Sequence, residues 1–181
     1  KMTVTSLYLE GKIIKPEDMN LQKRSHRYLL YNAILNNDSS LQGEKQIGDP
    51  TEACLLAMAR AAFHHTSVEL DEEDIRQMMP RLEELPFDSE RKMMSTKYLV
   101  HGVHTVFTKG ALDMLLPRIT GILTEDGVMA ITNEQRNAIL RQNEEFSQNG
   151  LRVLTFVYKE SVEDEALCLE TEEDYIFIGL V

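Results

Sequence analysis

The chain has 181 residues, of which 43% are hydrophobic and 27% are charged, the balance of a globular protein rather than a disordered one. This length suits one domain whose core needs neither disulfides nor a metal to hold it together. The formal net charge of −11 argues against nucleic acid as a partner, because such a chain repels phosphate backbones at long range.

In chain order, apolar spacing and turn residues predict ten elements. We expect a strand over residues 2–9, helices over 25–36, 51–64 and 75–79, strands over 92–100 and 103–109, helices over 111–116 and 132–148, and strands over 151–158 and 175–181. Residues 121–127 are expected to form a loop, and the acidic linker over residues 160–174 to be the most mobile segment.

These elements favour an α+β fold, with an antiparallel sheet flanked by helices in a single domain over residues 1–181. The strands come in pairs and the helices in blocks, rather than in strict alternation. Residues 175–181 show no polar alternation, which is typical of a central strand.

The remaining composition gives three narrower expectations. The two cysteines, Cys54 and Cys168, lie in apolar patterns, which indicates free buried thiols in a reducing compartment. No apolar run reaches the ~20 residues of a membrane-spanning helix and no signal peptide opens the chain, so we expect a soluble polypeptide. The acidic runs at residues 69–74 and 163–174 are interpreted as solvated surface rather than as a cation site.

The sequence lacks the motifs of a self-contained active site. Residues 43–48 have the glycine spacing of a P-loop, but Asp49-Pro50 stands where Lys and Ser/Thr are needed. His-Glu-x-x-His, Gly-x-Ser-x-Gly and Cys-x-x-Cys are all missing. A binding module is therefore the better interpretation, and a few local cations can hold a mononucleotide even in an acidic protein.

Two stretches carry the candidate ligand site. Residues 85–95, Leu-Pro-Phe-Asp-Ser-Glu-Arg-Lys-Met-Met-Ser, deliver the ring of Phe87 and the adjacent cations Arg91 and Lys92, which suit a nucleotide base and its phosphates. In residues 106–111, Lys109 is followed by Gly110, where no side chain blocks close approach, and by a predicted helix start with free N–H groups. Together the two stretches predict one pocket.

Four ordered motifs resemble the nucleotide-binding (N) domain of class II P-type cation-transporting ATPases, which include calcium, sodium/potassium and magnesium pumps. The motifs are Gly48-Asp49-Pro50-Thr51-Glu52, Pro86-Phe87-Asp88-Ser89-Glu90-Arg91-Lys92-Met93-Met94-Ser95, Phe107-Thr108-Lys109-Gly110-Ala111 and Gly150-Leu151-Arg152-Val153-Leu154. The two ends resemble the segments that join this domain to the phosphorylation domain. We therefore expect an N domain that has been excised at the two hinge strands joining it to the phosphorylation domain. The residues of its motifs are most similar to those of calcium pumps.

The resemblance implies an adenine pocket. Phe87 would stack on adenine, and Glu52 would accept a hydrogen bond from the adenine amino group. Lys109 would line the floor, with Gly110 and Ala111 permitting close packing. From the residues alone, Phe87 remains open as a core side chain and Glu52 as a first-turn acid without a ligand.

The resemblance also implies contacts to the rest of the nucleotide. Lys92 would reach the phosphates with help from Arg91, and Arg152 would close the phosphate end. Leu154 would pack on the base or ribose, with Thr51 as a weaker polar contact. Lys92 remains open as a solvated strand lysine. Animal calcium pumps carry an arginine two residues after the stacking phenylalanine, and this chain has Ser89 there, so one phosphate or ribose contact is missing.

The resemblance implies that the domain binds ATP or ADP and presents ATP, as Mg-ATP in the full-length pump, to the phosphorylation domain. The parent would be an integral membrane protein whose motif residues are similar to those of bacterial pumps. This domain and its partners, the actuator and phosphorylation domains, would lie in the cytoplasm. Calcium is implied only by family analogy. We expect a monomer that does not hydrolyse ATP alone, because the phosphorylated aspartate is not in this chain.

Two alternatives stay open. An interaction or regulatory domain could keep the fold without binding nucleotide, and Ser89 and the acidic surface favour it. A free-standing phosphotransferase or hydrolase has no support among the motifs.

Overall fold

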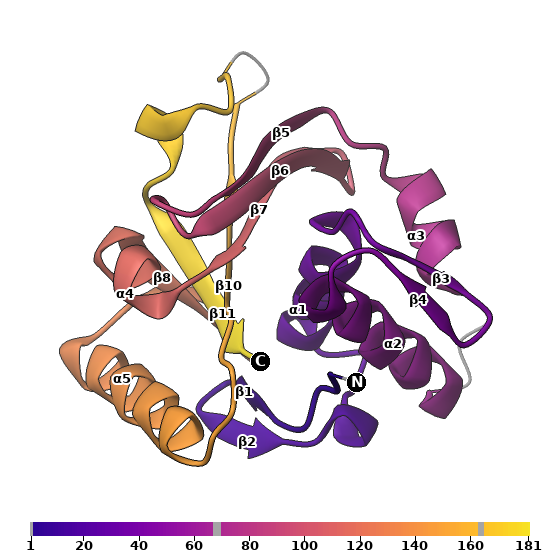
Figure 1. Ribbon diagram of the computed structural model, residues 1–181. Coiled ribbons are helices and arrows are strands. Elements are labelled where there is room, and N and C mark those ends of the chain that lie inside the picture. The colour runs from indigo at the N-terminus through magenta and orange to yellow at the C-terminus, as the bar shows by residue number, and fades with distance from the viewer. Residues whose placement is uncertain (1, 67–69, 163–164) are drawn as a thin grey trace.

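The computed structural model describes residues 2–66, 70–162 and 165–181, and in this part of the chain helices cover both faces of a large twisted sheet (Figure 1). The helices are α1 (Arg24–Leu35), α2 (Pro50–His65), α3 (Glu72–Met78), α4 (Leu112–Leu115) and α5 (Asn133–Gln148). The strands are β1 (Leu7–Leu9), β2 (Lys12–Ile14), β3 (Ser40–Gln42), β4 (Lys45–Ile47), β5 (Glu83–Asp88), β6 (Met93–Val100), β7 (Val103–Gly110), β8 (Ile119–Thr124), β9 (Gly127–Ala130), β10 (Thr155–Glu160) and β11 (Tyr175–Leu180).

The main sheet runs in the order β2-β1-β11-β10-β7-β6-β5, with antiparallel neighbours throughout. Strand β8 adds a parallel pairing to β11 and an antiparallel pairing to β9, while β3 and β4 form a separate hairpin. The predicted α+β class with a mostly antiparallel sheet is confirmed. Strand β11 is central, as its continuous apolar sequence predicts.

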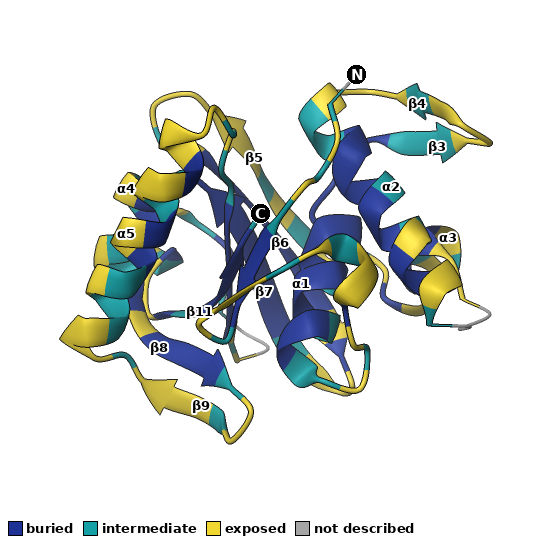
Figure 2. Ribbon diagram, turned by 90° about the horizontal axis from the view of Figure 1, so that it is seen from below, coloured by how far each residue is buried: buried dark blue, intermediate teal, exposed yellow. Residues whose placement is uncertain are grey.

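Both faces of the sheet are buried, which explains why its strands show little polar alternation. Successive side chains of a strand point to opposite faces. In β10, Phe156 and Tyr158 therefore join the core beneath α1, α2 and α3, whereas Val157 joins the core beneath α4 and α5. Figure 2 shows the buried sheet between these two groups of helices.

Helix starts follow local sequence signals. Asp49 caps α2 by accepting hydrogen bonds from the backbone N–H groups of Thr51 and Glu52, and Pro50 occupies the first turn, where its missing N–H costs nothing. Thr132 and Gln135 form a reciprocal capping box at the start of α5. These caps explain why the two long helices begin within one residue of their predicted starts.

The errors in the prediction concern strands, and one of them comes from pairing that is distant in sequence. Residues 121–127, predicted as a loop, contain most of β8, and the prediction was wrong because pairing with β11 outweighs a glycine-rich sequence. Strand β5 and the β3–β4 hairpin were not predicted at all.

The acidic runs are not uniformly solvated, as the sequence had suggested. Glu72 and Glu172 are buried, and each faces an arginine, Arg60 and Arg91 respectively. Within the described part of the 160–174 linker, Glu172 lies in the core. Glu69 of the first run and residues 163–164 of the second lie outside the described residues.

Cys54 is buried, Cys168 is half-buried, and both are free thiols. In the part of the chain described here, no helix is both long and apolar enough to cross a membrane.

Candidate functional site

A cavity of about 340 Å³ lies between the first turn of α2, strand β5, the ends of β6 and β7, and the segment before β10. Its volume falls in the range of about 300–1,000 Å³ that is typical of small-molecule sites. The lining residues are Asp49, Thr51, Glu52, Phe87, Met94, Lys109, Gly110, Arg152 and Leu154. Seven of the ten residues predicted from the sequence are in this set, and they come from four separate segments.

A buried ion pair forms the floor of the cavity. The Lys109 side chain is only 8% exposed, and its Nζ lies 3.5 Å from Oε2 of Glu52 and donates a hydrogen bond to the carbonyl oxygen of Asn36. Burial lowers the pKa of Lys109, and the nearby Glu52 carboxylate opposes this effect. Glu52 Oε2 also accepts from the Asp38 N–H at 2.5 Å. Both contacts use Oε2, so Oε1 carries neither of them.

Gly110 closes the floor because only glycine fits there. An added Cβ would lie 2.4 Å from the carbonyl oxygen of Lys92 and 2.7 Å from Met93 Cβ. The next residue, Ala111, does not line the cavity, and its N–H donates to the Lys92 carbonyl at 3.0 Å. The predicted free N–H at this position is therefore already occupied.

Phe87 forms the rim and is 63% exposed, so it is not a core side chain. It lies where the pairing of β5 with β6 is interrupted, between the register pairs Leu85 with Ser95 and Asp88 with Met93. Such an irregularity redirects a side chain. An exposed aromatic ring over an apolar and charged floor is suited to stacking on a base.

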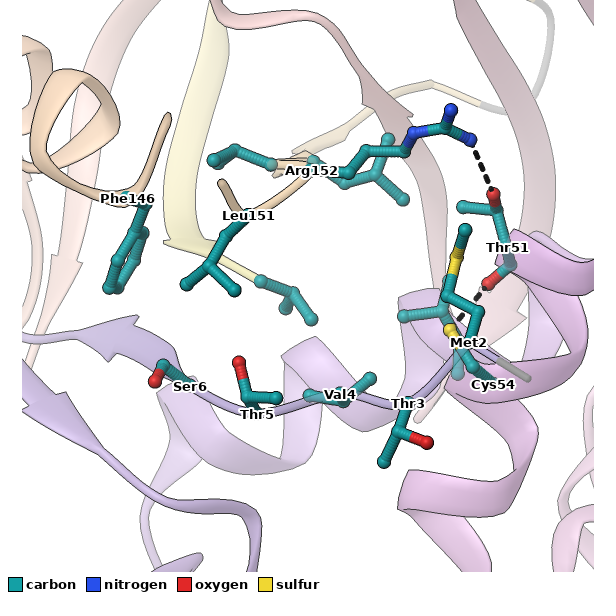
Figure 3. A pocket seen from close by; sticks show the side chains of 14 residues that line it. Met2, Thr3, Val4, Thr5, Ser6, Thr51, Cys54, Phe146, Leu151 and Arg152 are labelled. Carbon is teal, nitrogen blue, oxygen red and sulfur yellow. Dashed lines mark hydrogen bonds between the residues drawn. The ribbon is translucent and has the colours of Figure 1, made fainter. Parts of the chain in front are cut away.

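Arg152 bridges two elements at the edge of the cavity. Its Nη1 donates to Oγ1 of Thr51 at 3.3 Å, which links the segment before β10 to α2, and Figure 3 shows the guanidinium reaching toward this hydroxyl. A smaller cavity of about 90 Å³ lies beside this contact and shares Thr51, Arg152 and Leu154 with the larger one. Its other side is formed by residues 2–6 near the N-terminus.

Arg91 and Lys92 lie outside the cavity lining. Lys92 is exposed and adopts a left-handed backbone conformation with φ of 56° at the end of the β5–β6 turn. The Arg91 side chain is mostly buried and lies against Glu172, with 2.7 Å between Nε and Oε1. This position does not support the expected helper role of Arg91 toward phosphate.

Comparisons with known proteins decide the family. A family model described as "P-type ATPase, cytoplasmic domain N" matches residues 25–181. The chain belongs to this family. The N domain is 39% identical over 181 residues to calcium-transporting ATPase 1 of Bacillus cereus, covering 100% of the chain and 20% of that protein.

Two further relatives agree with this assignment. Calcium-transporting ATPase 1 of Lactococcus lactis is 39% identical over 182 residues, and a calcium-transporting ATPase of Listeria monocytogenes is 35% identical over 184 residues. Each match covers 99% of the N domain and 20% of the relative. The chain thus spans about a fifth of the length of these relatives, which are named calcium-transporting ATPases.

A third cavity, of about 500 Å³, is larger than the 340 Å³ cavity and lies elsewhere on the N domain. It is beside the β1–β2 turn, the β8–β9 turn and the first turns of α5. It contains none of the predicted site residues, so we assign the candidate site to the 340 Å³ cavity on the chemistry of its lining. Within the described ranges, no three or more His, Cys, Asp or Glu side chains gather as a metal site.

Sequence reasoning missed the loop that follows α1. Asn36 contacts Lys109 and Asp38 contacts Glu52, both through backbone atoms. Arg81 in turn holds this loop by donating to the Leu35 carbonyl at 2.8 Å and to Asp38 Oδ1 at 2.8 Å. The polar sequence of residues 36–40 indicated only a helix end, because backbone contacts leave no residue-type signal.

Proposed function

We propose that this N domain binds ATP in the 340 Å³ cavity and presents it to the phosphorylation domain of a P-type cation pump. The observation that carries the proposal is the meeting, in one cavity of suitable size, of seven residues from four segments that the family resemblance implies. The coarser statement, that the chain is an N domain of this family, rests on the comparisons.

For the base, we propose that Phe87 stacks on adenine and that Glu52 Oε1 accepts from the adenine amino group. Lys109 Nζ lies 3.5 Å from Oε2 of Glu52, which leaves Oε1 for the base. An acceptor at this place favours adenine over guanine, which presents a carbonyl at the corresponding position and would leave Glu52 facing another acceptor. Gly110 allows the adenine ring to approach the backbone closely, and Leu154 provides an apolar surface beside the ring.

For the phosphates, we propose that Arg152 makes the main contact and that Lys92 makes a second one. Arg152 is an exposed cation in the lining, with its guanidinium beside Thr51. Lys92 is an exposed cation at the turn that follows Phe87, with a side chain long enough to approach a bound phosphate. A charge-assisted contact of this kind is about twice as strong as a neutral hydrogen bond. Mg²⁺ would arrive with the phosphates and neutralise part of their charge.

The place of the site next to both ends of the chain supports the domain role. Residues 2–6 and Val181 both line the 90 Å³ cavity beside the candidate site. Leu154, which lines the cavity, exchanges two backbone hydrogen bonds of 2.9 Å with Val181. We propose that hinge motion about these ends carries the γ-phosphate to an aspartate of the phosphorylation domain, with the actuator domain as the other cytoplasmic partner.

The transported ion and the membrane belong to the same proposal. The names of the relatives state calcium transport. For the pump that contains this chain, we propose ATP-driven transport of a cation across a bacterial plasma membrane, with calcium as the leading candidate ion. The chain would bind ATP or ADP on the cytoplasmic side as a monomeric domain.

An amide NMR titration with ATP and then GTP tests nucleotide binding. We expect saturable shifts around Glu52, Phe87, Lys109 and Arg152 that are larger for ATP and that disappear in Phe87→Ala and Lys109→Ala variants which keep the fold. If millimolar ATP leaves the spectrum of the folded protein unchanged, the proposal fails, and an interaction domain without nucleotide becomes the better interpretation.

A further inference from the structure

The acidic linker before β11 sends one carboxylate into the core. The Glu172 side chain is 0% exposed, and its Oε2 accepts from the Ser95 hydroxyl. Ser95 lies on β6 next to Met94, which lines the 340 Å³ cavity. Because neighbouring strand residues point to opposite faces, Glu172 lies across the sheet from the cavity.

Arg91 connects this buried carboxylate to the backbone that presents Phe87. Its Nε lies 2.7 Å from Glu172 Oε1 as a close ion pair without hydrogen-bond alignment. Nη1 and Nη2 of Arg91 both donate to the carbonyl oxygen of Pro86, each at 3.2 Å. Nη2 also donates to the carbonyl oxygen of Leu85 at 3.3 Å. The planar guanidinium can serve all of these partners at once, which the ammonium of a lysine cannot do.

The segment around Phe87 has few other constraints. Pro86 has no N–H to donate to the neighbouring strand, and pairing between β5 and β6 is interrupted from Leu85 to Asp88. The ring itself is 63% exposed. The path of this backbone therefore depends on the carbonyl contacts of Arg91, and the direction of Arg91 depends on Glu172.

We propose that Glu172 and Arg91 are positioning residues which hold the Pro86–Phe87 backbone so that the ring of Phe87 stacks on the base. This inference rests on the proposed function, since it concerns the same nucleotide site. It assigns a role to the acidic linker, which is otherwise remote from the cavity. It also gives Arg91 a role in base affinity rather than in phosphate contact.

The linker offers a matched control. Glu165 is a second linker carboxylate, 3.4 Å from Lys159 Nζ, and its carbonyl accepts from Lys97 at 2.6 Å. These contacts anchor the linker without touching Arg91 or the backbone of Leu85 and Pro86. A Glu165→Gln variant therefore changes the linker and its charge without changing the connection to Phe87.

The experiment measures the dissociation constants for ATP and for adenosine by calorimetry or NMR titration. We expect Phe87→Ala to weaken ATP about 5- to 150-fold, the range for losing one base stack. Glu172→Gln should weaken ATP and adenosine by the same factor, about 5- to 10-fold, because the loss concerns the base. In the Phe87→Ala background the same substitution should change affinity less than twofold, and Glu165→Gln should leave it unchanged.

Two results would overturn the positioning role. One is a folded Glu172→Gln protein with unchanged ATP and adenosine affinity. The other is an equal loss with and without Phe87, which would indicate general destabilisation. If Glu172→Gln does not fold, Arg91→Lys decides in its place, because lysine keeps the charge opposite Glu172 and loses the paired carbonyl contacts.

A separate measurement distinguishes this proposal from the proposed function. The Phe87 ring and amide resonances of the ligand-free protein should shift in Glu172→Gln and stay in place in Glu165→Gln. Absence of the Phe87 shift overturns the positioning role whatever ATP does. If Phe87 shifts but Phe87→Ala leaves ATP binding intact, then the positioning stands and the proposed adenine site fails.

Discussion

The floor and the rim of the 340 Å³ cavity are built in opposite ways. The floor consists of Lys109, Glu52 and Gly110, which are tied into the sheet and α2 by an ion pair and a close backbone approach. The rim consists of Phe87 and Arg152, which are exposed, and Arg152 is tied to α2 by its hydrogen bond to Thr51. Substitutions in the floor should therefore lower stability as well as binding, whereas substitutions in the rim should lower binding alone.

This difference follows from where each part lies in the fold. The floor is at the boundary between the sheet and α2, so its charged groups have lost most of their water and need each other. The rim belongs to an irregular strand and a connecting segment at the surface, where side chains can remain open for a ligand. The division predicts separable effects of mutation.

The largest loss of stability is expected from Lys109→Met. The variant leaves the Glu52 carboxylate without its cation in a site that is only 19% exposed at Glu52, so the free energy of unfolding should fall by about 2–3 kcal/mol. Urea denaturation measures this loss. A Lys109→Met, Glu52→Gln double variant should recover part of it, since no unpaired charge then remains. No recovery would contradict the ion-pair explanation.

Gly110→Ala tests the close backbone approach in the floor. The new methyl would lie 2.4 Å from the Lys92 carbonyl oxygen and 2.9 Å from Met93 Cα, both backbone atoms, so β6 and β7 must separate. We expect a loss of about 1–3 kcal/mol in unfolding free energy, typical of overpacking. Gly102→Ala is a control for removing a glycine without a clash, although its φ of 82° makes it strained in another way.

Phe87→Ala tests the rim. Because the ring is exposed, the unfolding free energy should change by less than about 0.5 kcal/mol. ATP affinity should nevertheless fall by about 5- to 150-fold if the ring stacks on adenine. Denaturation and calorimetry on the same sample separate the two quantities. A large loss of stability would mean that Phe87 belongs to the folded core of this region and not to an open rim.

The smallest expected effect is the pH dependence that Lys109 adds to stability. Burial lowers its pKa in the folded state below the ordinary 10.5 of the unfolded chain. Between the two values the unfolded state binds more protons, so the stability contributed by this group rises with pH toward 10.5. The stability difference between the wild type and Lys109→Met should therefore shift in favour of the wild type as pH increases. A difference independent of pH would contradict the lowered pKa.

Local signals in the sequence were enough for the helices and for the hairpin of β6 and β7. Asp49 and Pro50 start α2, and the Thr132–Gln135 capping box starts α5, through contacts that span only a few residues. The motifs also supplied most of the cavity lining, because residue types are read directly from the sequence, whereas the exposure of Phe87 is known only from the structure. The resemblance to the N-domain family is likewise a property of the sequence, and it names seven residues that meet in one cavity.

Only the tertiary structure decided which of these residues face the same space. Arg91 and Lys92 are neighbours in sequence, yet Arg91 is mostly buried and Lys92 is exposed to solvent. The reason is that Arg91 forms an ion pair with the buried Glu172, which lies 81 positions further along the chain. The strand β8 and the backbone contacts of Asn36 and Asp38 were equally hidden, since they depend on pairing between distant segments. The sequence by itself determined the helices, the β6–β7 hairpin and the residue types of the site, because these depend on local signals. Long-range packing determined which side chains form the floor, the rim and the support behind it.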